Sequence, residues 1–116
     1  MKVLVVEDDA AVARATVRML QFLRASAEEV RSVAEAEARI SAGAAYDVVL
    51  ADVGATASSG GSGRFTGWLR ERAPGARLIL TSGRPAPADF HSVPPERVFL
   101  QKPWGMPELR AALCLS

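Results

Sequence analysis

Residues 47–52 read DVVLAD, an apolar run with an aspartate at each end. A short run that is apolar at every position is typical of a strand buried on both faces of a parallel sheet. Comparable runs occupy residues 3–6, 77–81 and 97–100, and a weaker, alternating one occupies residues 28–33. The sequence therefore predicts a parallel sheet in which the strand at residues 47–51 ends at a carboxylate, that of Asp52.

The segments between these runs change to helical spacing. In residues 10–25 the apolar side chains fall on one stripe, and Asp9 stands where an N-cap is expected. Further helices are predicted at residues 34–41, 64–73 and 106–115. Strands that alternate with helices in this way predict an α/β fold, with a parallel sheet covered on both faces.

Two segments give no clear element. Residues 54–63 contain only small residues, mainly glycine, serine and alanine, so we expect a long loop inside one βα unit. Residues 84–95 contain four prolines, which leave room only for a short or irregular helix near residues 88–92. With this short helix included, the βα unit repeats five times along the chain.

Length and composition favour a small soluble domain. The chain has 116 residues, which suits a single domain spanning residues 1–116. Its 14 basic and 13 acidic residues leave a net charge of +1 without a cationic run, so we expect neither nucleic acid nor membrane as a partner. A single cysteine excludes an internal disulfide, and no run is long enough to span a bilayer. These features favour the cytoplasm.

Polar side chains stand at the ends of the predicted strands. Glu7 and Asp8 follow the first strand, Asp52 the third, Ser82 the fourth and Lys102 the fifth. We expect these side chains to meet, because ligands of an open parallel sheet bind at the carboxyl ends of its strands. Clustered carboxylates repel one another, and a bound divalent cation would remove this repulsion. Because the available ligands are oxygen atoms, Mg²⁺ is the cation that we expect. A bound cation and an ammonium would together offset the charge on a transferred phosphoryl group.

Over its whole length the sequence resembles the response-regulator receiver domains of two-component signalling. The resemblance is carried, in order and at near-family spacing, by VVEDD at 5–9, DVVLADV at 47–53, LTSG at 80–83 and FLQKPW at 99–104. It implies a flavodoxin-like, doubly wound (βα)5 fold. In this fold a five-stranded parallel sheet has the strand order 2-1-3-4-5.

The resemblance also implies an acidic metal site. Asp52 matches the phosphoacceptor, Asp8 the acid that binds Mg²⁺ directly, and Glu7 its partner, which usually acts through water. The backbone carbonyl of Gly54 would be a further ligand. One departure follows the acceptor, where the family commonly has an aliphatic residue and then proline but this chain has Ala55-Thr56.

The remaining positions match the family's switch. Ser82 matches the hydroxyl that binds the phosphoryl group, with Thr81 as the second choice. Lys102 matches the lysine that pairs with the phosphoryl group, and its bond to Pro103 is usually cis in the family. Phe99 matches the aromatic residue that would rotate inward when Ser82 is drawn toward the phosphoryl group.

The resemblance implies a signalling switch that catalyses only its own phosphorylation and dephosphorylation. A sensor histidine kinase or phosphotransfer protein would phosphorylate Asp52, and an unknown output protein or a second copy in a homodimer would bind the changed surface. The chain is then either a stand-alone regulator or part of a hybrid kinase. An alternative is a phosphorylation-independent docking or dimerisation module, which the irregular segments 54–63 and 84–95 favour. A flavin or nucleotide binder would need a glycine motif that the sequence lacks.

Overall fold

The computed structural model describes residues 1–88, 90–93 and 96–114. Its strands form one parallel sheet of five in the order β2-β1-β3-β4-β5, which confirms the predicted order. They are β1 (Lys2–Val6), β2 (Ser26–Val30), β3 (Val48–Asp52), β4 (Arg77–Ser82) and β5 (Arg97–Gln101). Because β3 pairs with β1 on one side and β4 on the other, it lies in the middle of the sheet, as its apolar sequence predicted.

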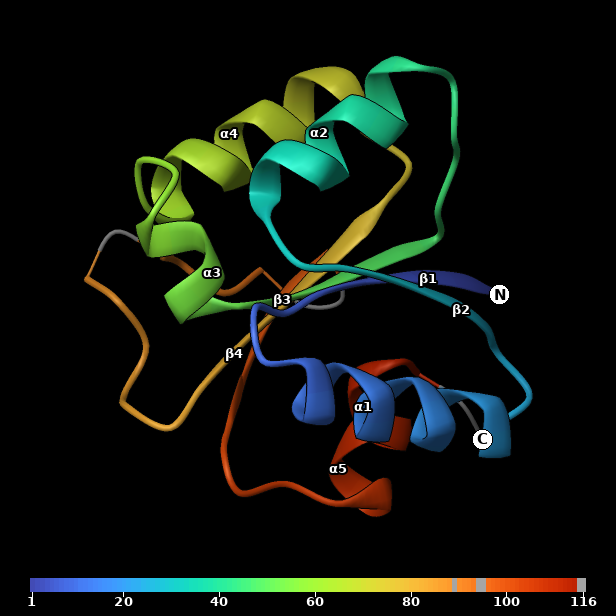
Figure 1. The fold of residues 1–116 in the computed structure, drawn as a ribbon. Coiled ribbons are helices and arrows are strands. Elements are labelled where there is room, and N and C mark those ends of the chain that lie inside the picture. The colour runs from blue at the N-terminus through green and yellow to red at the C-terminus, as the bar shows by residue number, and fades with distance from the viewer. Residues whose placement is uncertain (89, 94–95, 115–116) are drawn as a thin grey trace.

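Helices cover both faces of the sheet (Figure 1). On one face lie α1 (Ala10–Phe22) and α5 (Met106–Ala112). On the other lie α2 (Val33–Ser41), α3 (Val53–Ala57) and α4 (Ser62–Arg72). The predicted doubly wound α/β architecture is therefore confirmed.

The core consists of two apolar clusters, one on each face. Alternate residues of β3 belong to different clusters, because successive side chains of a strand point to opposite faces. Val48 and Leu50 join the cluster of Leu20 on α1, whereas Val49 joins that of Phe65 on α4. Both helical side chains are fully buried. The sheet is thus fixed from both sides, and its carboxyl edge is held in place.

The ends of two helices follow the sequence closely. Asp9 is the N-cap of α1, since its Oδ1 accepts from the backbone N–H groups of Ala11 at 2.9 Å and Val12 at 3.1 Å. Gly43 follows the last turn of α2 with φ of 104°, a left-handed conformation that favours glycine. The predicted cap of α1 is therefore confirmed, and Gly43 marks the end of α2.

The prediction of a loop over residues 54–63 was wrong. This stretch contains most of α3 and the start of α4, which begins at Ser62. The side chain of Asp52 caps α3, since its Oδ2 accepts from the N–H of Gly54 at 2.8 Å. Ala55 and Thr56 of this helix are buried. Capping and burial therefore stabilise a helix that small, weakly helical residues did not suggest.

The fourth connection also differs from its prediction. Residues 88 and 90–93 form no helix, and Asp89, the remaining residue of the predicted helix, lies outside the described part of the chain. The backbone bonds otherwise, since Phe90 N–H donates to Pro87 O at 3.0 Å and Val93 pairs with Arg97 in an isolated antiparallel bridge. In the described residues this is the one connection between neighbouring strands of the sequence that contains no helix.

Two predicted boundaries move by a few residues. The second strand covers Ser26–Val30 and not residues 28–33, because these residues pair in register with β1. The last helix ends at Ala112, and Leu115, its predicted end, lies outside the described residues. Within the described residues, no helix combines the length and the apolar character needed to cross a membrane.

Candidate functional site

Three carboxylates lie together at the carboxyl edge of the sheet. Glu7 and Asp8 directly follow β1, and Asp52 is the last residue of β3. These strands are neighbours, with Val6 paired to Ala51, so their ends coincide. One carboxylate oxygen from each residue lies within 4.8 Å of the others. This group of oxygen ligands has the spacing needed to hold a metal ion.

Glu7 is the buried member of this group, with 5% of its surface exposed. Its backbone N–H donates to Val30 O at 3.1 Å, and its carboxylate accepts from Asp9 N–H at 3.2 Å. Burial raises the pKa of Glu7; the Asp9 N–H opposes this rise, while the adjacent carboxyl groups of Asp8 and Asp52 add to it. Negative charge is therefore crowded here, and a cation would relieve it.

Lys102 supplies one positive charge to this edge. Its Nζ lies 3.0 Å from Asp52 Oδ1 and 3.4 Å from Glu7 Oε1. Burial alone would lower the pKa of Lys102, but the hydrogen bond and charge of Asp52, with the charge of Glu7, raise it above its ordinary value. Lys102 N–H donates to Ser82 O at 2.8 Å, and the following bond to Pro103 is cis, as the resemblance implied.

Gly54 lies close to the Asp52 carboxylate. Its N–H donates to Asp52 Oδ2 at 2.8 Å, and a Cβ on Gly54 would lie 2.8 Å from that same oxygen. A side chain at this position would therefore displace the carboxylate. The role of the Gly54 carbonyl as a metal ligand stays a prediction.

The two candidate hydroxyls differ in their surroundings. Thr81 is buried; its Oγ1 donates to Leu100 O at 2.7 Å and accepts from Trp104 Nε1 at 2.9 Å. Ser82 is half-buried, and its Oγ accepts from Arg84 N–H at 3.1 Å. Within the described residues, Ser82 makes no hydrogen bond to Asp52. Because the buried Thr81 hydroxyl already makes two hydrogen bonds, Ser82 is the hydroxyl that is less constrained.

Phe99 shares a face of the sheet with Ser82. In the pairing of β4 with β5, Leu80 lies opposite Phe99, and Ser82 lies two residues further along the same strand. The half-buried Phe99 packs against the core on the α4 side, with its ring 6.4 Å from that of Phe90. Its rotation on phosphorylation stays a prediction.

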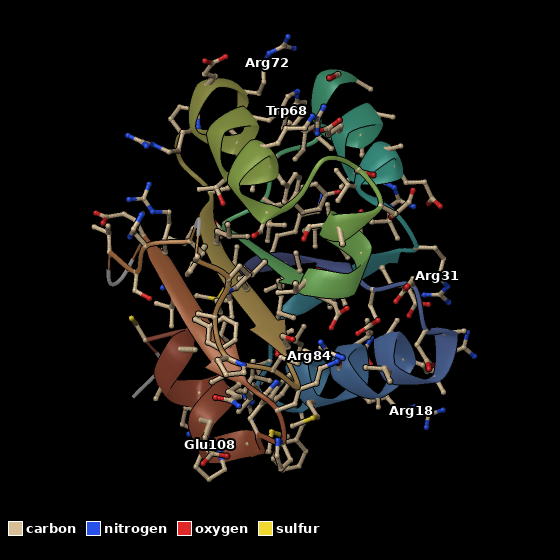
Figure 2. All side chains as sticks on the ribbon, turned by 90° about the vertical axis from the view of Figure 1, so that its left-hand side faces the viewer. Arg18, Arg31, Trp68, Arg72, Arg84 and Glu108 are labelled. Atoms are coloured by element: carbon tan, nitrogen blue, oxygen red, sulfur yellow. The ribbon has the colours of Figure 1, made fainter. Side chains whose placement is uncertain are left out.

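Sequence reasoning did not predict the contact of Trp104 with Thr81, which depends on the course of the chain after the cis bond. Arg84 follows Ser82 by two residues, and its side chain in Figure 2 extends from the end of β4 toward the start of α1. Its place in the sequence predicts an influence on the rate of dephosphorylation, which stays a prediction.

Comparison with known proteins rests on structure. No protein-family profile and no curated protein matches the chain. A response regulator receiver protein from Sinorhizobium medicae superposes with a TM-score of 0.83, at 23% identity over 98% of this chain and 91% of that one. A receiver domain from Methylobacillus flagellatus gives 0.79, at 23% identity over 98% and 96%. Chemotaxis response regulator CheY4 of Vibrio cholerae gives 0.77, at 20% identity over 97% and 95%.

The fold is therefore that of the response-regulator receiver domains. The comparisons agree with the strand order and with the arrangement of helices on the two faces. The carboxyl edge of this fold carries three acids and a lysine in this chain.

Proposed function

We propose that the chain is a phosphoacceptor receiver domain, in which Mg²⁺-dependent phosphorylation of Asp52 switches the binding of an output protein. The observation that carries the proposal is the pairing of Lys102 Nζ with Asp52 Oδ1 at 3.0 Å, beside two further carboxylates. Glu7 is buried and Asp52 is half-buried beside one ammonium, an arrangement that is costly for stability alone, so this edge is better explained by chemistry.

The donor set fits Mg²⁺. It includes three carboxylate oxygens within 4.8 Å of one another, and burial beside like charges raises the pKa of Glu7. Asp8 and Asp52 would hold the ion directly, Glu7 through water and Gly54 through its carbonyl. When bound, Mg²⁺ offsets the negative charge of the acids and of an incoming phosphoryl group.

The transfer itself needs little covalent chemistry from the protein. A carboxylate oxygen of Asp52 forms a bond to phosphorus while the bond from phosphorus to a phosphohistidine nitrogen of the donor breaks. The electron pair stays with the imidazole, which takes a proton from solvent. Lys102 binds a phosphoryl oxygen, and Ser82 donates its hydroxyl hydrogen to another. The donor is a sensor histidine kinase or a phosphotransfer protein, in the cytoplasm.

The switch follows from the same contacts. When Ser82 turns toward the phosphoryl group, it leaves space on the face that it shares with Phe99. Phe99 then rotates inward from its contact with Phe90, which changes the surface beside β5. The domain thus acts through a shift between two states and converts no free substrate.

Intact-mass measurement with a small-molecule phosphodonor tests the proposal. We expect one phosphoryl adduct that requires Mg²⁺ and is absent from Asp52→Asn. Asp9→Asn is the matched control, because asparagine also caps a helix and Asp9 has no proposed role in transfer; it should still take up the phosphoryl group. Absence of an adduct, with no Mg²⁺-dependent change of Trp104 fluorescence in a Trp68→Phe background, would refute the proposal.

A docking module that works without phosphorylation is the second candidate. It is favoured by the fourth connection, whose described residues form no helix and so give this face an unusual shape. In that case Asp52→Asn would retain full binding of the output protein.

A further inference from the structure

Two adjoining cavities lie between α4 and the segment that leads into β5. The larger has a volume of about 310 Å³ and the smaller about 170 Å³. They share Thr66 and Arg70 of α4 and Arg97 of β5. Neither cavity is lined by the acids or the lysine of the carboxyl edge, so this is a separate location.

The cavities lie where the sheet lacks a covering helix. The described residues between β4 and β5 contain none, and every residue of β5 is at least partly exposed, whereas the first four residues of β3 are buried. Arg97 pairs in register with Leu78 and so lies on the α4 face. An arginine at a position that would face a covering helix shows that this part of the face is adapted to a different contact.

The lining combines an apolar wall with a cationic rim. Leu69 and Leu78 contribute to the wall of the larger cavity, together with Val93, which is 41% exposed. Arg70 and Arg97 form the rim, with Glu96 as the one acid in the lining. Over residues 1–88, 90–93 and 96–114, neither arginine has an ion-pair partner. This rim is therefore complementary to an acidic partner.

We propose that this groove binds an amphipathic, acidic helix of another protein. The helix would take the place that the fourth connection leaves uncovered, with apolar side chains in the larger cavity and carboxylates beside Arg70 and Arg97. A second copy of the chain fits less well. Among the described residues its most exposed large apolar side chain is Phe22, at 75%, which lies one turn from Arg18 and would bring like charge to the rim. The proposal does not depend on phosphorylation.

The test uses a synthetic probe and the unphosphorylated chain. The probe is a capped helical peptide of alanine, leucine and glutamate, about 15 residues long, with leucines on one face and glutamates flanking them. Titration followed by amide NMR should move the signals of Thr66, Leu69, Val93 and Arg97. A matched peptide with glutamine for glutamate should bind about tenfold more weakly.

Variants of the chain distinguish binding in the groove from unspecific electrostatic attraction of the acidic peptide. Arg70→Ala with Arg97→Ala should weaken the glutamate peptide about tenfold, whereas Arg14→Ala with Arg18→Ala on the opposite face of the sheet should leave its affinity unchanged. Ala76→Leu fills the larger cavity and keeps both arginines. This variant should abolish binding of the glutamate peptide.

Three outcomes would overturn the proposal. One is no binding of the glutamate peptide. Another is equal weakening by the two arginine pairs, which would indicate unspecific attraction. The third is concentration-dependent self-association that protects the same amides, which would identify a second copy as the occupant. Because all measurements use unphosphorylated protein, failure of the phosphorylation proposal leaves their interpretation unchanged.

Discussion

Thr81 connects three segments near the carboxyl edge. Its hydroxyl donates to Leu100 of β5 and accepts the indole N–H of Trp104, which follows the cis bond after Lys102. We expect Thr81→Val, which keeps the shape of the side chain, to lower the free energy of unfolding by about 1–2 kcal/mol. The reason is that both hydrogen bonds are lost while their partner groups stay in place.

Urea unfolding measures this difference, and Thr66→Val is its control. The Thr66 hydroxyl also donates to a backbone carbonyl, Ser62 O at 2.7 Å, but within a helix and on a half-exposed side chain. Its replacement should change the free energy of unfolding by less than about 0.5 kcal/mol. Equal losses in the two variants would contradict a special role for Thr81.

Glu28 gives a pH-dependent prediction. The hydroxyl of Tyr46 donates to Glu28 Oε1 at 2.8 Å and is the main cause that lowers the pKa of Glu28; Lys2 and Arg39 contribute further. A carboxyl group with a pKa that is lower in the folded chain stabilises the fold above its ordinary pKa of 4.5, and this contribution is lost as the pH falls below that value. Tyr46→Phe should therefore raise the pKa of Glu28 in a carboxyl NMR titration. An unchanged pKa would refute the assigned cause.

Among the helices, α4 contains a glycine that the fold does not need. Gly67 lies in the middle of α4, is exposed, and a Cβ there would meet no atom within 4 Å. Gly67→Ala should therefore stabilise the chain by about 0.5–1 kcal/mol. Gly43 also has open space, but its φ of +104° opposes any side chain, so Gly43→Ala should destabilise by about 1 kcal/mol. Thermal unfolding of the two variants should shift in opposite directions.

The strands were more predictable than the connections between them. The residues of β1 and β3 are apolar at all but one position, and β4 contains the apolar run LIL, so burial on both faces could be read directly from the sequence. The start of β2 was misplaced because it lies at the edge of the sheet, where Glu28 and Glu29 remain partly exposed. The helix α3 was missed because its residues are small and weakly helical, while burial of Ala55, a tertiary property, helps to stabilise it.

The candidate site was predictable to the extent that it depends on strand ends. Glu7, Asp52 and Lys102 each follow or end a recognisable strand, so the topology alone brings them to one edge. The groove beside Arg70 and Arg97 could not be predicted, because it depends on the absence of a helix that the alternating pattern led us to expect. A groove that forms because a helix is absent leaves no periodic pattern in the sequence.

For the molecule as a whole, helices pack on both faces of a single sheet, so the effect of a substitution on stability should depend on how deeply the side chain is buried. Leu20 of α1 is fully buried, whereas Phe22, two residues later, is 75% exposed. Leu20→Ala should lower the free energy of unfolding by about 2–5 kcal/mol, and Phe22→Ala should change it by less than about 0.5 kcal/mol. Urea unfolding of the two variants makes the comparison; a large loss in Phe22→Ala would indicate that α1 packs differently.

The ammonium at the carboxyl edge is made long after the acids it pairs with. Lys102 follows Asp52 by 50 residues and Glu7 by 95, and it is held in place only once β5 has paired with β4. Chains emerge from the ribosome amino end first, so a growing or truncated chain has the aspartate and its acidic neighbours without the charge that offsets them. The charges of this edge are therefore assembled completely only after residue 102 has been made and β5 has paired with β4.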